Sequence, residues 1–269
     1  MDQPIAILDS GVGGLTVAKE MMRQLPQEQI VYFGDTARTP YGPRPAEEIV
    51  RFTQEIVDYL LQFQPKMIVI ACNTATAAAW DQVRMSLDIP VVGVIQPGAR
   101  AAIKTTRRST VGVIGTEGTI RSRAYEHALR RIAPQIQVIG IACPEFVPLV
   151  EKGLFRGEEA QLVVERSLAE LKPAELDCLI LGCTHYPFLS DIIGSVMGPD
   201  VALISSADET AREISTILYH KGMQAKSTFA PVHQFFCSGD PQLFRTIAET
   251  WLNEPIQVTP VVWEVPNIY

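Results

Sequence analysis

The chain has 269 residues, of which 47% are apolar and 20% charged, and its formal net charge at pH 7 is −7. This length and composition suit one large or two modest globular α/β domains, and the negative charge argues against a general nucleic-acid surface. Because no signal-type stretch and no apolar run of roughly 18 residues is found, we expect a cytoplasmic protein without a membrane span.

Short apolar runs alternate with helical periodicities along the whole chain. The clearest helix has one apolar face from Ile49 to Phe63, begins near Pro45 and ends before Pro65. The expected strands are Ile5 to Leu8, Ile30 to Phe33, Met67 to Ala71, Val91 to Ile95, Val111 to Ile114, Ile136 to Ile141, Cys178 to Leu181, Val201 to Ser205, Gln234 to Cys237 and Ile256 to Val262. This alternation predicts an α/β fold with mostly parallel sheets that are flanked by helices.

The two halves of the chain repeat each other weakly. The run Ile5 to Ser10 parallels Val111 to Thr116, and Cys72 parallels Cys183 at a similar offset. Coincidences of this kind are common in α/β sequences, but the matched cysteines favour a true duplication. We therefore expect two similar lobes related by a pseudo-twofold axis, with Cys72 opposite Cys183 across one cleft.

Both of these cysteines follow a buried strand and precede hydroxyl or amide side chains. Ligands of open α/β sheets bind outside the carboxyl ends of the strands, so both thiols are expected to face a ligand. An odd number of cysteines, five, argues for reduced thiols, and we interpret Cys178, Cys143 and Cys237 as small core residues. No zinc spacing is found, so no metal is expected. A dithiol redox pair remains an alternative.

Opposed thiols suit the inversion of a carbon that bears an acidic hydrogen. Such a reaction needs a base on one face of the substrate and an acid on the other. A free thiol has a pKa of about 8.5, so forming the thiolate at pH 7 costs roughly 2 kcal/mol. Backbone N–H groups at a strand-to-helix junction, and His185 near Cys183, are neighbours that would lower this cost.

Other strand ends carry polar groups for a small polar ligand such as an α-amino acid. The substrate carboxylate is expected to be held by backbone N–H groups and by Ser10, Asn73, Thr74 and Thr184. Asp9 and Glu151 are the acidic candidates for the ammonium group, although the residues around Glu151 alone favour a solvated helix end. Tyr41 and Gly42, with Asp35, are expected on a loop at the rim of the cleft.

At these positions the sequence resembles the cofactor-independent glutamate racemases of bacteria, particularly those of bacilli, from about Pro4 to the region after Trp251. The resemblance rests on five motifs: Asp9-Ser10-Gly11-Val12-Gly13-Gly14, Tyr41-Gly42-Pro43-Arg44, Ala71-Cys72-Asn73-Thr74-Ala75-Thr76, Gly93-Val94-Ile95-Gln96-Pro97-Gly98 and Gly182-Cys183-Thr184-His185-Tyr186-Pro187.

The resemblance implies interconversion of L- and D-glutamate, supplying D-glutamate for peptidoglycan, without a cofactor. Cys72 and Cys183 would be the acid/base thiols for the D and L enantiomers, respectively. Asp9 would assist Cys72, whereas His185 and Glu151 would assist Cys183. The substrate contacts implied are Asp9, Ser10, Tyr41, Gly42, Asn73, Thr74, Thr184 and His185. It also implies that residues 1–97 and 208–269 form the first lobe and 98–207 the second, and that the protein is a homodimer.

Three alternatives remain from the sequence. An aspartate or other amino-acid racemase would keep both thiols but change the contacts to the distal group of the substrate. A Cys-His hydrolase would use one thiol as a nucleophile. An amino-acid-binding protein would bind glutamate without exchanging its α-hydrogen.

Overall fold

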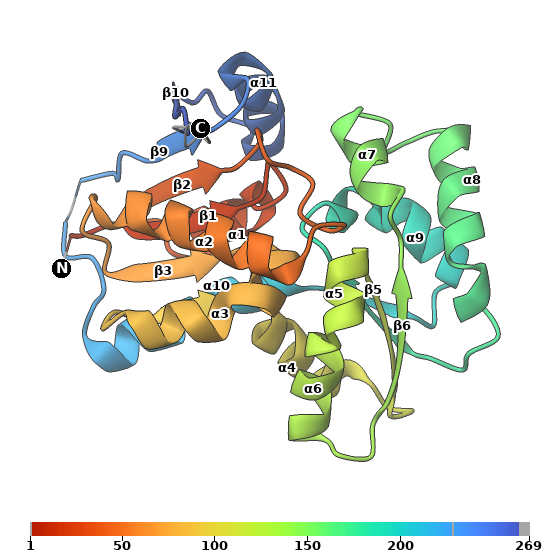
Figure 1. Cartoon of the computed structure of the whole chain (residues 1–269). Coiled ribbons are helices and arrows are strands. Elements are labelled where there is room, and N and C mark those ends of the chain that lie inside the picture. Colours follow the sequence, from red (N-terminus) through yellow and green to blue (C-terminus); the bar gives the residue numbers. More distant parts are fainter. Residues whose placement is uncertain (1, 228, 264–269) are drawn as a thin grey trace.

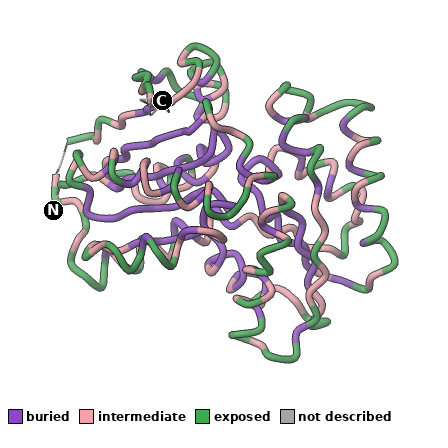
Figure 2. The backbone as a smooth tube through the Cα atoms, viewed as in Figure 1, coloured by how far each residue is buried: buried purple, intermediate pink, exposed green. Residues whose placement is uncertain are grey.

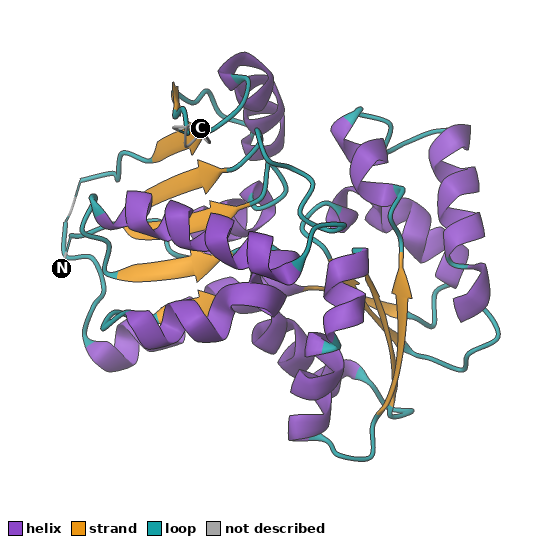
Figure 3. Cartoon of the chain, viewed as in Figure 1, coloured by secondary structure: helices purple, strands orange, loops and turns teal. Residues whose placement is uncertain are grey.

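The computed structural model describes residues 2–227 and 229–263. Their strands form two parallel sheets, which Figure 1 shows as two lobes side by side and Figure 3 as two sets of arrows among helices. The first sheet has the order β10-β9-β2-β1-β3-β4 and the second the order β6-β5-β7-β8. The strands are β1 (Ile5–Asp9), β2 (Ile30–Gly34), β3 (Met67–Ile70), β4 (Val91–Gly93), β5 (Thr110–Gly115), β6 (Gln137–Ala142), β7 (Cys178–Gly182), β8 (Ala202–Ser205), β9 (Gln234–Cys237) and β10 (Val258–Pro260).

Helices cover both faces of each sheet, as expected for parallel strands. They are α1 (Leu15–Gln24), α2 (Ala46–Leu61), α3 (Asn73–Ser86), α4 (Ile95–Thr105), α5 (Glu117–Ser122), α6 (Ala124–Ile132), α7 (Phe146–Glu151), α8 (Glu158–Ser167), η1 (Ala169–Leu171), η2 (Tyr186–Leu189), α9 (Ser190–Met197), α10 (Ser206–Lys221) and α11 (Pro241–Leu252). Among the described helices, none is both long and apolar enough to cross a membrane.

Alternate side chains of β1 point to opposite faces of the first sheet. Ile5 and Ile7 pack in a core with α1, α10 and α11, whereas Ala6 and Leu8 pack under α2 and α3. Burying a side chain as large as Ile or Leu contributes roughly 1.5–3 kcal/mol. Figure 2 shows β1, β2 and β3 as buried backbone, so both faces of the sheet are core at these strands and their ends are left for function.

The second sheet follows the same rule. Cys178 and Ile180 of β7 pack with α4 and α6, whereas Leu179 and Leu181 pack with α7, α8 and α9. Its order, β6-β5-β7-β8, repeats the order β2-β1-β3-β4 of the first sheet. The matched sequence runs therefore occupy the same positions in the two sheets, β1 with β5 and β3 with β7. The chain then returns, and β9 and β10 extend the first sheet beyond β2.

The predicted helix that starts near Pro45 is confirmed as α2. The strand expected from Val91 to Ile95 is wrong at its end, because β4 stops at Gly93 and Ile95 begins α4. Ile95 lies instead in the core of the second lobe, so the chain leaves the sheet early to cross between the lobes. The last expected strand, Ile256 to Val262, is also shorter, and only Val258–Pro260 forms strand at the edge of the sheet.

Candidate active site

The two cysteines singled out in the sequence follow equivalent strands, β3 and β7, and line one cavity of about 20 Å³. Their exposures are only 5% for Cys72 and 6% for Cys183. The cavity is lined by Ser10, Thr39, Pro40, Tyr41, Gly42, Cys72, Asn73, Thr74, Thr116, Val147, Cys183, Thr184 and His185. A cavity of this volume has room for about one water molecule, so the two lobes are closed around the thiols.

Cys72 is the N-cap residue of α3, as the strand-to-helix pattern predicted. The backbone N–H of Ala75 donates to Cys72 Sγ at 3.4 Å, and the thiol donates to Ser10 Oγ, also at 3.4 Å. Burial, together with the negative charge of Asp9, raises the pKa of Cys72 to about 12 despite these contacts. Cys72 therefore keeps its proton at neutral pH in the closed site.

Asp9 lies at the end of β1 and is fully buried. Burial raises its pKa, and the charge of His185 opposes that effect. Its Oδ1 accepts from the backbone N–H of Gly11 at 2.9 Å, and its Oδ2 accepts from the hydroxyl of Thr184 at 3.3 Å. Asp9 thus joins the first lobe to the residue that follows Cys183.

Cys183, unlike Cys72, lies next to an imidazole, that of His185. His185 Nδ1 lies 3.8 Å from Cys183 Sγ, and His185 Nε2 lies 3.4 Å from Glu151 Oε1. Burial would lower the pKa of His185, but its contacts with Cys183 and Glu151 outweigh burial and raise that pKa to about 10. The imidazole is therefore a cation at neutral pH, between a sulfur atom and a carboxylate.

Glu151 ends α7, and its side chain is 32% exposed. The local expectation of a solvated helix end misses its contact with His185. The expected α-helix does not begin directly after Cys183, as it does after Cys72. The short 3₁₀ helix η2 comes first, with the Tyr186 N–H bonded to the Cys183 carbonyl oxygen at 3.1 Å, and α9 follows it.

The lobes approach each other closely at Gly13. A Cβ atom at this position would lie 2.4 Å from Thr184 Oγ1 and 2.6 Å from His185 Nδ1. Contacts shorter than 3 Å are not tolerated by real Cβ atoms, and both neighbours are buried side chains of the second lobe. Only glycine lets the turn after β1 pass under the residues that follow Cys183.

Three threonine hydroxyls meet where α3 of the first lobe faces α5 of the second. Thr74 Oγ1 lies 2.8 Å from Thr116 Oγ1 and 3.3 Å from Thr119 Oγ1. Nearby, the Gly118 N–H donates to the Gly42 carbonyl oxygen at 2.9 Å, which fixes the rim loop against the second lobe. Sequence reasoning missed Thr116. The repeat contained the signal, because Thr116 is the counterpart of Ser10.

Tyr41 reaches the cavity on the loop expected at the rim, but Asp35 does not lie on a rim. Asp35 is fully buried and accepts a hydrogen bond from the Tyr41 hydroxyl. Its carboxylate also accepts from Arg38 Nε at 2.6 Å, Ser238 Oγ at 2.7 Å and Trp263 Nε1 at 2.9 Å. Asp35 therefore supports Tyr41 from behind.

Nine of the expected site residues line the cavity, while Asp9 and Glu151 contact lining residues. Among the described residues that line it, none is Lys or Arg.

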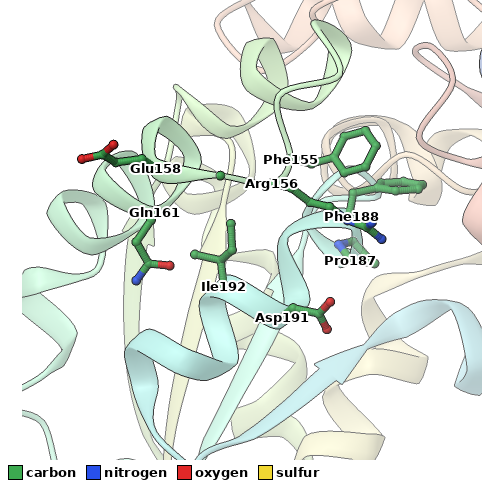
Figure 4. Close-up of a pocket in the computed structure, with 9 residues that line it drawn as sticks. Phe155, Arg156, Glu158, Gln161, Pro187, Phe188, Asp191 and Ile192 are labelled. Atoms are coloured by element: carbon green, nitrogen blue, oxygen red, sulfur yellow. The ribbon is translucent and has the colours of Figure 1, made fainter.

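A larger hollow of about 670 Å³, shown in Figure 4, lies between the start of α8 and the η2–α9 segment. Figure 4 shows Arg156, Glu158 and Asp191 around it, and it contains none of the expected site residues.

Comparison with known proteins identifies the family of the chain. Residues 10–214 match the family model described as Asp/Glu/Hydantoin racemase. A glutamate racemase of Oceanobacillus iheyensis is 56% identical over 255 residues, which cover 94% of this chain and 93% of that protein.

Solved structures are also similar to this chain over nearly its whole length. A glutamate racemase isoform of Bacillus anthracis has a TM-score of 0.94 at 50% identity, covering 96% of this chain and 97% of the other. A glutamate racemase of Francisella tularensis in complex with D-glutamate has a TM-score of 0.91 at 34% identity, covering 98% of each chain. The family match, these relatives, the fold and the paired cysteines at the strand ends together show that the chain belongs to the Asp/Glu/hydantoin racemase family.

Proposed function

We propose that this protein is a glutamate racemase that interconverts L- and D-glutamate by proton transfer between two cysteines. The observation that carries the proposal is the pair of buried thiols, Cys72 and Cys183, at equivalent strand ends on one cavity. The glutamate racemases to which the chain is similar support glutamate as the substrate. The D-glutamate formed would serve the synthesis of peptidoglycan.

In the direction from L to D, the Cys183 thiolate removes the α-hydrogen of L-glutamate as a proton. The Cys72 thiol then delivers its own proton to the opposite face of the α-carbon. The reaction leaves a thiol on Cys183 and a thiolate on Cys72. Before the next turnover in this direction, Cys183 must lose a proton and Cys72 must gain one. The different surroundings of the sulfurs suit this direction, because the His185 cation adjoins Cys183 while Cys72 holds its proton.

In the reverse direction Cys72 must lose its proton next to the carboxylate of Asp9. Among the described residues that line the cavity there is no Lys or Arg, and His185 lies beside Cys183, so the ammonium group of the substrate would supply the positive charge next to Cys72. Asp9 would hold this ammonium group and assist Cys72. On the other side, His185 and Glu151 would assist Cys183.

Neutral donors bind the two carboxylates of the substrate. Ser10, Asn73 and Thr184 are proposed for one carboxylate, with backbone N–H groups at the start of α3. The hydroxyls of Thr74 and Thr116, beside Tyr41 and Gly42, are proposed for the other. A chain of hydroxyl donors at this end would recognise the length of glutamate.

Glutamate cannot enter a closed cavity of about 20 Å³, so the lobes must separate for substrate to bind. We propose that the lobes divide into residues 1–97 plus 208–269 and residues 98–207. Residues 1, 228 and 264–269 of the first lobe lie outside the described part of the chain. We also propose that the protein is a homodimer, which analytical ultracentrifugation would test.

Incubation of each glutamate enantiomer in deuterated water tests the mechanism. The native protein should incorporate deuterium at the α-carbon of the newly formed enantiomer first, because the delivered proton comes from a thiol that exchanges with solvent. Cys72→Ser and Cys183→Ser should each lower racemisation by several orders of magnitude. Cys178→Ala is the matched control, since that thiol is buried on β7, the strand that Cys183 follows, but packs in the core.

Other outcomes would contradict the proposal in different ways. A modest loss in either serine variant would point to one-base chemistry. Racemisation of aspartate rather than glutamate would change the substrate but keep the mechanism. Binding of glutamate with no exchange of its α-hydrogen would identify a binding protein.

A further inference from the structure

We propose that Tyr125 is a positioning residue that fixes the side-chain amide of Asn73 for substrate binding, an inference that rests on the proposed function. Tyr125 belongs to α6 in the second lobe, whereas Asn73 is the first residue of α3 in the first lobe. The Tyr125 hydroxyl donates to Asn73 Oδ1 at 2.7 Å, and both residues are buried, with exposures of 3% and 2%.

This hydrogen bond decides which way the amide points. Burial raises the pKa of Tyr125, so the phenol stays protonated and remains a donor. With its oxygen engaged, Asn73 turns its NH₂ group elsewhere, and Asn73 Nδ2 is buried with no partner among the described residues. A buried donor without an acceptor is unfavourable, so the site favours an anionic ligand, such as a substrate carboxylate, in front of Asn73.

The ring of Tyr125 also touches the other side of the site. A Cβ atom on Gly182 would lie 3.1 Å from Tyr125 Cε2, and Gly182 directly precedes Cys183. Asn73 directly follows Cys72. One side chain therefore rests against the residue before one thiol and holds the residue after the other.

Tyr125 lies where the chain crosses between the lobes. A Cβ atom on Gly98, in α4, would lie 3.4 Å from the Tyr125 hydroxyl and 3.2 Å from Ser206 Cβ. Ser206 begins α10, the second crossing. Because both crossings meet at Tyr125, its hydroxyl holds Asn73 in a position that is set by the junction of the lobes.

Tyr125→Phe removes only the hydroxyl. The contact is present in the substrate complex and in the transition state alike, so its loss should weaken binding uniformly. We expect KM for glutamate to rise about tenfold while kcat changes less than threefold. Circular dichroism measures both directions, and the ratio kcat/KM must fall equally for the two enantiomers because the equilibrium constant of racemisation is one.

Tyr186→Phe is the matched control. The Tyr186 hydroxyl is also buried and donates to the Cys143 carbonyl oxygen at 2.9 Å, but this bond stays within the second lobe. Thermal unfolding should show similar losses of Tm for the two variants. A merely structural role of Tyr125 would predict a smaller active fraction, a lower kcat and an unchanged KM.

A double-mutant cycle separates the positioning role from other effects. The dissociation constant of D-glutamate, measured by calorimetry, should rise about tenfold for Tyr125→Phe in the native background. In the Asn73→Ala background the same change should have less than a twofold effect. Equal effects in the two backgrounds, or an unchanged KM in Tyr125→Phe, would overturn the inference. Absence of racemisation by the native protein would refute the proposed function instead.

Discussion

A conservative substitution of Asp35 should strongly reduce the stability of the protein, because its carboxylate accepts four side-chain hydrogen bonds. Oδ2 accepts from Tyr41 Oη and Arg38 Nε, and Oδ1 accepts from Ser238 Oγ and Trp263 Nε1. Asp35→Asn turns one of these oxygens into an NH₂ donor. The hydroxyls of Tyr41 and Ser238 can adapt by accepting, but Arg38 Nε and Trp263 Nε1 are donors only. In either orientation of the amide, one donor faces another.

The magnitude follows from these contacts. A hydrogen bond to a charged group contributes about 1.5–3 kcal/mol, and loss of one partner from a buried ion pair costs about 3–5 kcal/mol. We expect Asp35→Asn to lower the free energy of unfolding by about 3–5 kcal/mol in urea at pH 7. KM should rise as well, since Tyr41 loses its support. Asp58→Asn, on an exposed surface of α2, should change stability by less than about 0.5 kcal/mol.

Trp263→Phe provides a direct check of this reasoning. It removes the indole N–H, so the amide of Asp35→Asn can then direct its NH₂ group toward Ser238 without opposing a donor. The double variant should therefore be more stable than the sum of the single losses predicts, by at least about 1 kcal/mol. Strict additivity, or a loss below about 1 kcal/mol for Asp35→Asn alone, would refute the argument.

Three further outcomes are expected. Gly13→Ala should lower kcat/KM at least about 100-fold while the protein stays folded, as a Cβ atom 2.6 Å from His185 Nδ1 forces the lobes apart; activity near native would show that the lobes adapt. The stability that the His185 cation contributes is complete below its unfolded pKa of about 6.5 and is lost as pH rises to about 10, because folding raises this pKa. Glu151→Gln should therefore shift the alkaline fall of both stability and activity to lower pH, and an unmoved pH profile would count against the contact. Lys66→Met should destabilise by about 3–5 kcal/mol in urea unfolding, since it leaves the buried Glu28 carboxylate without its cation; a loss below about 1 kcal/mol would contradict this.

The strands and the two thiols were predictable because their signals are local. An apolar run followed by a small residue and Cys marks the end of a buried strand, and both β3 and β7 fit that pattern. The return of the chain to the first sheet was not visible in periodicity. Nothing in Gln234–Cys237 indicates which edge it will join, and only the family resemblance implied the return.

Two contacts that support the site depend on partners that are distant in the sequence. Glu151 reads as an exposed helix end until His185 is brought beside it by η2. Asp35 reads as a loop residue because its partners Ser238 and Trp263 come from the other end of the chain. Single-residue patterns cannot show such contacts, since they arise from packing between elements that are far apart in sequence.

The discontinuity of the first sheet has a consequence for synthesis on the ribosome. All four strands of the second sheet emerge before β9, which covers the outer edge of β2. Until then the nascent polypeptide exposes the unpaired backbone of β2, and an open edge is a template for pairing with other chains. The strand that pairs with the outer edge of β2 is thus among the last segments to be translated, and this edge stays open until β9 has emerged.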